Sequence, residues 1–364
     1  GGMLDRNGLR PARYTITKTG TMVVASEVGV MDFDPTVIAE KGRLQPGKIL
    51  LIDTQEGKIY YDGEIKDRLA NEHPYRQWLN TNRIQLEKIH TGRKVSNAVD
   101  NLEAKEVEFG FGEEDVADTL IPMAIKGQEP TASMGNDTPL AVLSDQPQIF
   151  FNYFRQQFAQ VTNPAIDSIR EQLVMSLTEY IGRVGTGILN PDETNCKMVR
   201  LPHPILTNSQ LDILQNIRYK GFNTRKLNIC FVPSPKGSEH PGEALREALD
   251  KLCHDAEKSV DDGFNYIILS DRDVDKDHVA IPSLLAVSAV HHYLINVGKR
   301  VQTALIVESG EIREVMHAAL LLGYGASALC PYMTYAILDD LVKKGKIQEN
   351  YATAEANYIK AVKK

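Results

Sequence analysis

The chain has 364 residues, 42% of them hydrophobic and 24% charged, a composition that excludes disordered and fibrous proteins. Lys and Arg number 41 against 48 Asp and Glu, and the resulting net charge of −7 argues against nucleic acid as a partner, which would need clustered positive charge. The apolar stretches are too short to span a membrane, and the first residues lack a signal-peptide pattern. We therefore expect a cytoplasmic protein of several domains without membrane contact.

The cysteines indicate neither a disulfide framework nor a metal site. There are 4 of them, far apart and without a Cys-x-x-Cys pair: Cys196, Cys230, Cys253 and Cys330. Such spacing is typical of free thiols in a reducing compartment. We expect no metal and no bound cofactor in this chain.

Residues 1–68 carry the pattern of short antiparallel strands. Arg13–Lys18 and Thr21–Ser26 alternate in polarity around a turn and predict one hairpin. Lys48–Asp53 and Lys58–Asp62 predict a second one. A sheet of this size cannot bury both of its faces alone, so it needs a partner layer, and we expect the chain to begin inside a domain.

The next segments are predicted to be helical. Residues 69–104 are polar with scattered apolar anchors, which is typical of a linker that wraps across a domain boundary. The segment from Phe109 to Ile188 is expected to be mostly helix and loop. One helix is predicted to begin at Asp167-Ser168, because apolar side chains follow at helical spacing in Ile169, Leu173, Leu177 and Tyr180.

From Leu227 onward, strand and helix patterns alternate. Four consecutive strand–helix units predict a parallel sheet covered by helices, either open or part of a barrel. The predicted strands are Leu227–Val232, Tyr266–Ser270, Val301–Glu308 and Ser327–Cys330, and the predicted helices are Gly242–Val260, Ile281–Val297, Ile312–Leu322 and Tyr332–Lys344. The fold class is therefore α/β, with an antiparallel β piece at the N-terminus.

Acidic residues follow two of the predicted strands. The Asp-x-Asp-x-Asp-x-Asp run from Asp271 resembles a calcium loop, but the required Gly and Glu positions hold Lys276 and Pro282, so a solvated loop is favoured. Asp271 and Glu308 lie at strand ends, where ligands bind in parallel sheets. They could act as the acid and base of a stand-alone barrel enzyme, although helix N-terminal caps are the favoured interpretation.

Several longer strings follow one another in a fixed order. They are Asp5–Tyr14, Ala25–Val30, Pro122–Ala124, Glu129–Pro130, Ser133–Asp137, Pro139–Ser144, Phe158–Pro164, Ile169–Glu171, Pro204–Leu206 and Val307–Glu311. The first two resemble the back half of a glutamine amidotransferase domain of the N-terminal-nucleophile class, where they belong to a β sandwich. The ordered set resembles the large chain of the glutamate synthase family, and specifically its central domain.

The resemblance implies a division of the chain and a function. Residues 1–68 would be the C-terminal part of a class II glutamine amidotransferase domain, 69–104 a linker, and 105–364 the central domain. In the family, an oxidoreductase makes L-glutamate from L-glutamine and 2-oxoglutarate: ammonia released from glutamine crosses to a flavin barrel, where reduced FMN reduces the imine that forms. The implied partners are the glutaminase and FMN-barrel domains of the same chain and a small NAD(P)H-oxidising subunit.

The sequence departs from the whole family enzyme in three ways. It has no N-terminal Cys, which is the nucleophile of glutamine hydrolysis. It lacks the closely spaced cysteines of an iron–sulfur cluster, and it ends at Lys364, where the barrel should begin. We therefore expect a piece of a longer enzyme that is inactive alone, with FMN and the iron–sulfur cluster held elsewhere in the parent enzyme.

Three residues are implied to line an ammonia tunnel. From the residues alone, Met134 is expected to pack in a core and Thr162-Asn163 to form a turn before Pro164. In the family, the matching positions form the constriction of the tunnel, so the resemblance assigns this role to Met134, Thr162 and Asn163. A pure scaffold, which holds two catalytic domains in register and has no site of its own, is the alternative.

Overall fold

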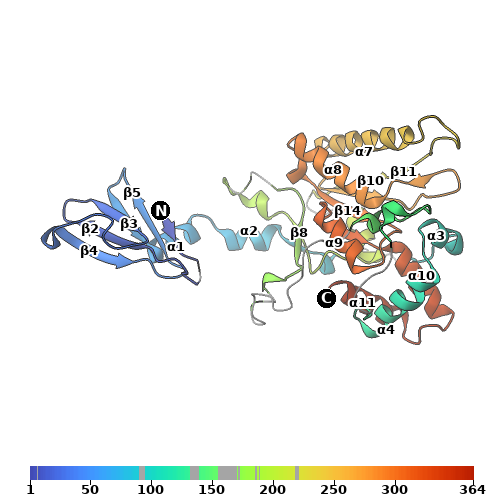
Figure 1. The fold of residues 1–364 in the computed structure, drawn as a ribbon, viewed down its shortest axis with the longest axis horizontal. Helices are drawn as coiled ribbons and strands as arrows, with labels where there is room; N and C mark the ends of the chain where they lie inside the picture. Colours follow the sequence, from blue (N-terminus) through green and yellow to red (C-terminus); the bar gives the residue numbers. More distant parts are fainter. Residues whose placement is uncertain are drawn as a thin grey trace. The chain divides into compact units, whose positions relative to one another are not determined.

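A computed structural model describes residues 1–5, 7–89, 95–131, 139–154, 170, 173–184, 187, 189–217 and 221–364. The contacts between Cα atoms divide the chain into two compact units, Gly1–Asn80 and Thr81–Lys364, which are traced in sequence colours in Figure 1. No helix in these described ranges is long and apolar enough to cross a membrane.

The first unit contains two small antiparallel sheets. Their strand orders are β1-β5-β6 and β3-β2-β4. The elements are β1 (Gly2–Met3), β2 (Arg13–Thr17), β3 (Met22–Ala25), η1 (Pro35–Val37), β4 (Ile38–Arg43), β5 (Ile49–Asp53), β6 (Lys58–Tyr61), α1 (Asp62–Asn71) and α2 (Tyr75–Asn82). Both predicted hairpins are confirmed, because β2 pairs with β3 and β5 pairs with β6.

Helix α1 begins earlier than the sequence pattern suggests. The strand predicted over Lys58–Asp62 ends at Tyr61, and Asp62 is already the first helical residue. The Asp62 carboxylate accepts hydrogen bonds from the backbone N–H of Ile49 at 3.2 Å and from the Lys48 ammonium at 2.9 Å. Acidic Asp62 and Glu64 therefore occupy the first turn, where the helix dipole favours negative charge.

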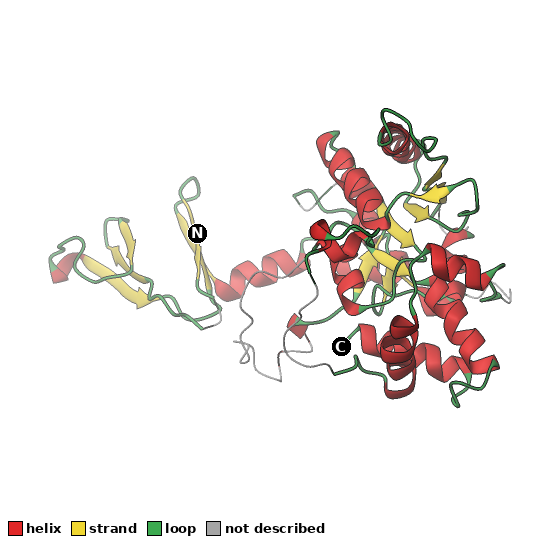
Figure 2. Ribbon diagram, turned by 45° about the vertical axis from the view of Figure 1, so that its right-hand side comes forward, coloured by secondary structure: helices red, strands yellow, loops and turns green. Residues whose placement is uncertain are grey.

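The second unit is organised around a parallel sheet. Its order is β10-β12-β14-β15, and all three strand pairs are parallel. Every residue of β12 and β14 is buried, as their continuous apolar sequences require. Helices pack around this sheet (Figure 2). The strands are β10 (Thr224–Asn228), β12 (Tyr266–Ser270), β14 (Ala304–Glu308) and β15 (Ala328–Cys330).

The predicted alternation of strands and helices is confirmed, but the first predicted strand, Leu227–Val232, is wrong in its bounds. The parallel strand ends at Asn228, and Cys230–Phe231 pairs antiparallel in a separate sheet. The helices of this unit are α3 (Leu102–Glu108), α4 (Ile121–Lys126), α6 (Asn208–Gln215), α7 (Glu243–Asp261), α8 (Ser283–Asn296), α9 (Val315–Gly323), α10 (Tyr332–Lys343) and α11 (Tyr351–Val362), with a π-helical segment η3 (Asp115–Leu120) and short 3-10 turns η2 (Leu86–Lys88), η4 (Ala141–Leu143), η5 (Phe150–Tyr153), η6 (Glu193–Cys196) and η7 (Arg300–Gln302). In the described part of the chain, the parallel sheet is open, because β10 and β15 do not pair with each other.

Two small sheets and one short segment flank the parallel sheet. The small sheets have the orders β7-β9-β8 and β11-β13. Their strands are β7 (Ile84–Gln85), β8 (Glu179–Ile181), β9 (Val199–Leu201), β11 (Cys230–Phe231) and β13 (Val279–Ala280). Beside β15, the backbone N–H of Leu206 donates to Leu329 and that of Leu329 donates to Pro204. This segment covers an edge that would otherwise expose unpaired backbone groups.

One predicted helix is wrong at its C-terminal end. Its predicted start at Asp167-Ser168 and its first apolar position, Ile169, lie outside the described residues. Tyr180, however, belongs to strand β8 and pairs with Arg200 of β9, and Leu177 lies just before that strand. Pairing with a strand about 20 residues away outweighs the local helical spacing, as tertiary contacts often outweigh local propensity.

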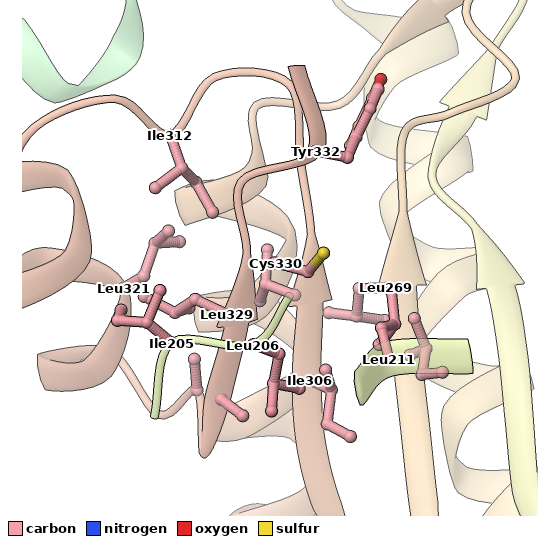
Figure 3. Packing of buried hydrophobic residues seen from close by; sticks show 14 of the residues in the cluster. Ile205, Leu206, Leu211, Leu269, Ile306, Ile312, Leu321, Leu329, Cys330 and Tyr332 are labelled. Carbon is pink, nitrogen blue, oxygen red and sulfur yellow. The ribbon is translucent and has the colours of Figure 1, made fainter. Parts of the chain in front are cut away.

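The main hydrophobic core lies in the second unit. Side chains from the sheet and from α6 gather in one apolar cluster, shown in Figure 3 for Leu206, Leu211, Leu269, Ile306 and Leu329. The hydroxyl of Tyr332, at the start of α10, points away from this cluster in the same view. The core therefore holds the strands in register and leaves polar groups beyond their carboxyl ends.

The first unit should be the less stable one. Its buried hydrophobic residues are Leu44, Leu50 and Ile65, whereas β12 and β14 are buried throughout. Little apolar area is removed from water in the first unit, so its backbone hydrogen bonds should open more readily. Hydrogen exchange should be faster in β2–β6 than in β12 and β14. Equal protection of the two sets of strands would contradict this expectation.

Candidate functional site

The structure does not place the three predicted tunnel residues. Met134, Thr162 and Asn163 all lie outside the described residues. The tunnel assignment therefore stays a prediction. The candidate site that the structure does describe is the carboxyl edge of the parallel sheet.

The carboxyl ends of the parallel strands bring polar residues into one row. Ser270 at the end of β12 is in register with Asn228 of β10 and with Glu308 of β14, and Glu308 is in register with Cys330 of β15. In open parallel sheets, this edge is where ligands bind. The chemistry of the edge therefore decides whether it could be an active site.

Glu308 is a buried carboxylate with two cationic partners. The Lys226 ammonium lies 2.8 Å from it, and the Arg272 guanidinium pairs with its other oxygen. The Ser270 hydroxyl donates a third hydrogen bond at 2.7 Å. Burial acts to raise the pKa of Glu308, but the charges of Arg272 and Lys226 outweigh it and hold this pKa below the ordinary value. Glu308 is therefore ionised and fully engaged.

Arg272 connects this carboxylate to two helices. Its guanidinium donates to the side-chain oxygen of Asn208, the first residue of α6, at 2.8 Å. It also lies over the ring of Tyr332, with 4.2 Å between the guanidinium carbon and the ring centroid. Asn208 in turn donates to Asn97 at 2.8 Å. A cation held by a carboxylate, an amide and an aromatic face is a fixed structural group.

Asp271, which directly precedes Arg272 in the chain, is completely buried. It accepts from the Ser309 hydroxyl at 2.5 Å and from the Gly310 backbone N–H at 3.0 Å. Burial raises the pKa of Asp271 to about 7, against the opposing effect of the Ser309 hydrogen bond and with help from the negative charge of Glu311. Asp271 thus ties the loop after β12 to the loop after β14.

One expectation about these carboxylates is wrong, and another holds only in part. Neither Asp271 nor Glu308 caps a helix, because α8 begins at Ser283 and α9 at Val315, both well beyond them. The loop from Asp271 is only partly solvated: its next three acidic residues are exposed, but Asp271 itself is not. The described residues contain no group of His, Cys, Asp or Glu that could hold a metal ion.

The cap of α8 comes from a different residue. The Glu311 carboxylate accepts from the Ser283 backbone N–H at 2.7 Å and from the Ser283 hydroxyl at 2.5 Å. Burial raises the pKa of Glu311, although both of these hydrogen bonds favour its charged form. The loop after β14 therefore supplies the anion that the N-terminus of α8 favours.

Arg313 fastens the same loop to the segment after α3. Its guanidinium donates to the Phe109 carbonyl at 2.7 Å, to the Gly110 carbonyl at 2.8 Å and to the Asp115 carboxylate at 3.0 Å. The side chain is 1% exposed. Its guanidinium carbon lies 4.0 Å from the centroid of the Phe111 ring. A buried cation with three oxygen acceptors is a strong and directional cross-link.

His317 lies next to Arg313 in the core and is neutral. Its ring stacks on Phe151 with 4.3 Å between centroids, and its Nδ1 lies 3.2 Å from the Glu311 carbonyl oxygen and 3.4 Å from the Arg313 backbone nitrogen. Burial and the Arg313 charge lower the pKa of His317 to about 3. In the neutral ring, this nitrogen donates to the Glu311 carbonyl or accepts from the Arg313 N–H, according to the tautomer.

Glu308, Arg272 and Asp271 at the carboxyl edge are all engaged with internal partners. The thiols of this edge are not activated: burial raises the pKa of Cys230 to about 12, and burial raises that of Cys330 well above its ordinary value. Glu308 is paired with two cations that hold its pKa below the ordinary value, so it is a weak base. An iron–sulfur cluster does not fit either, because the four free cysteines are not grouped in space with other ligands in the described ranges.

Sequence reasoning missed most of this network. Lys226 and Asn208 carry no motif, and Arg313 binds carbonyls about 200 residues earlier in the chain. The available signal was charge next to a buried strand: Asp271 and Arg272 follow Ser270, the last residue of β12, and charged residues at such a position must be paired.

Comparison with known protein families identifies the chain. The model of the glutamate synthase central domain matches residues 104–364. The chain belongs to the glutamate synthase family. The model of class-II glutamine amidotransferases matches residues 1–78. The resemblance inferred from the ordered strings is thereby confirmed.

Curated relatives match along the whole chain. It is 42% identical to the "Glutamate synthase [NADPH] large chain" of Bacillus subtilis, 39% to the "Glutamate synthase [NADH]" of Schizosaccharomyces pombe and 40% to the chloroplastic "Ferredoxin-dependent glutamate synthase" of Spinacia oleracea. Each match covers 100% of this chain but only 23%, 18% and 23% of the respective relative. The chain thus spans less than a quarter of the length of these proteins.

Asp271 should make the stability of the protein depend on pH. Its pKa is about 7 in the folded state and 3.8 ordinarily. Between pH 3.8 and pH 7, the folded protein therefore keeps a proton on Asp271 that the unfolded chain has released. Stability should therefore fall as pH rises through this range. In the unmodified protein, the free energy of unfolding should fall between about pH 5 and pH 8. Asp271→Asn should make this fall smaller by about 1–3 kcal/mol, measured by urea unfolding at each pH.

The matched control for this experiment is Asp273→Asn, which changes an exposed carboxylate of the same loop. We expect the pH dependence of its unfolding free energy to equal that of the unmodified protein. If Asp271→Asn also left that dependence unchanged, Asp271 would not hold a proton near neutral pH.

Arg313 should not be replaceable by lysine. A lysine ammonium cannot reach the Phe109 carbonyl, the Gly110 carbonyl and the Asp115 carboxylate from one planar group as the guanidinium does. Arg313→Lys should lower the free energy of unfolding by about 2 kcal/mol. Arg246→Lys, at an exposed position of α7, is the control and should be neutral within about 0.5 kcal/mol. Equal effects of the two substitutions would show that the cross-link contributes nothing.

Proposed function

We propose that this chain is the part of a glutamate synthase that links its glutaminase domain to its flavin domain and helps to form the ammonia tunnel. The parent enzyme would be an oxidoreductase of ammonia assimilation that makes L-glutamate from L-glutamine and 2-oxoglutarate. Ammonia released from glutamine would cross this segment, and the imine that it forms with 2-oxoglutarate would be reduced by FMN. The supporting observation is the order of the two matched families: an amidotransferase portion directly precedes a central-domain portion.

The proposed division of the chain follows the same order. Residues 1–68 would be the end of the amidotransferase domain, with the N-terminal-nucleophile sandwich as its fold, 69–104 a linker and 105–364 the central domain. The exposed faces of the sheets in the first unit support the sandwich, because such sheets need a further layer. Ile84 and Leu86 are buried in the main core, so the linker would be anchored on the central domain.

The electron donor would be selected elsewhere in the parent enzyme. Relatives named for NADPH, NADH and ferredoxin are similarly close to this chain, at 42%, 39% and 40% identity. A segment that selected the donor should instead resemble one class. FMN and the iron–sulfur cluster, together with any small NAD(P)H-oxidising subunit, would therefore bind outside the residues described for this chain.

A purely structural scaffold is the second candidate. The observation that favours it is the carboxyl edge of the sheet, where Asp271, Glu308 and Arg313 are all engaged with internal partners. On this view the domain would set the distance between two active sites and would contribute no tunnel residue.

Tunnel variants in the full-length enzyme separate these two functions. Thr162→Val removes a hydroxyl and Met134→Trp adds bulk, so each should hinder ammonia in a narrow passage. We expect glutamine hydrolysis to continue while less glutamate forms per ammonia released, by at least about twofold. Ammonia added from outside should support glutamate formation nearly as well as in the unmodified enzyme.

The control is Met175→Trp, which changes a side chain that is 66% exposed and should leave the coupling intact. Unchanged coupling in both tunnel variants would support the scaffold and contradict the tunnel assignment.

A further inference from the structure

A half-open groove lies on the second unit, apart from the carboxyl edge of the sheet. It has a volume of about 790 Å³, and its walls come from α3, η3, the start of α4 and α10 with the residues that follow it. The large apolar residues of its lining are Leu102, Phe111, Val116, Ile121, Ile337 and Leu341. Exposed apolar surface of this kind between helices is typical of a binding surface.

One rim of the groove is acidic, and its carboxylates form no direct ion pair with any described residue. Glu103 and Glu106 lie one turn apart on α3, and Glu113 lies near the start of η3. Within the part of the chain that the structure describes, these three carboxylates form no ion pair or side-chain hydrogen bond. Burial and the charges of Asp340 and Glu103 raise the pKa of Glu106 and outweigh the opposing charges of Lys344 and Lys346. The groove thus holds a carboxylate that would gain from a cationic neighbour.

The opposite side of the groove has a different charge pattern. Asp340 on α10 is already paired with Lys344 at 2.7 Å, and Lys346 follows just after the helix. Both lysines act on Glu106 without forming an ion pair with it, and the lining as a whole keeps more carboxylates than lysines, with three of them along the α3 rim. A ligand that fits this groove has an apolar face, which contacts the apolar lining, and cationic groups along one side, which face the α3 rim.

We propose that this groove binds an amphipathic helix of a partner protein, with its apolar face on the floor and two Lys or Arg side chains, one turn apart, against Glu103 and Glu106. A helix matches because it presents apolar side chains in a strip and repeats its charges at the same spacing as the rim. A small cation would leave the apolar floor in water. An acidic or uncharged helix would leave the rim carboxylates without partners.

The test uses a synthetic peptide of about 16 residues with leucines at i, i+3 and i+7 and two lysines one turn apart. A second peptide has glutamate at the two lysine positions. Fluorescence anisotropy with the complete protein should give at least about tenfold tighter binding of the lysine peptide. Absence of binding of the lysine peptide, or equal binding of both peptides, would overturn the proposal.

Variants then locate the binding site. Ala104→Trp fills the groove from an exposed position of α3, and Glu103→Gln with Glu106→Gln removes the rim charge. Each should weaken binding of the lysine peptide by at least about fivefold. Glu243→Gln with Glu247→Gln removes the same charge from α7 and should leave the affinity unchanged.

Two results of the variant series would overturn the proposal. An equal loss of affinity in the α7 control would show that the peptide responds only to the overall negative charge. Self-association of the protein that Ala104→Trp abolishes would assign the groove to a second copy of this chain.

Discussion

Two carboxylates buried at the ends of neighbouring parallel strands impose the main constraint on the second unit. A buried charge is costly unless it is paired or holds a proton. Glu308 meets this constraint with Lys226 and Arg272, and Asp271 meets it through the loop after β14 and through a pKa raised by burial to about 7. The loops beyond the strands therefore have little freedom, because they supply the groups that the carboxylates need.

The strands and helices of the second unit could be predicted closely from the sequence, because the pattern of buried apolar residues determines where they form. Tyr266–Ser270 and Ala304–Glu308 are continuous apolar runs, which suit strands covered on both faces, and the helix between them is apolar around most of its circumference. The resemblance to glutamate synthases was also accessible, because it depends on the order of strings along the chain.

The polar network could not be predicted in the same way. Each of its links joins residues that are distant in sequence: Lys226 reaches Glu308 across an intervening strand, and Arg313 binds the carbonyls of Phe109 and Gly110. Local pattern gives no information about such pairs. Capping was a reasonable expectation for an acidic residue after a strand, yet the residue that caps α8 is Glu311, which comes after the helix in sequence.

The same network fixes the wall of the groove that we propose as a binding surface. Lys105 of α3 donates to the carbonyl of Arg272 at 3.2 Å, and Arg313 holds the two carbonyls that follow this helix. A Cβ atom at Gly310 would lie 2.6 Å from the Phe109 ring, so the loop after β14 can approach α3 only because this residue is glycine. The charged edge of the sheet is thus connected to the acidic rim of the groove, because Lys105 and Arg313 hydrogen-bond α3 and the residues after it to the loops beyond β12 and β14.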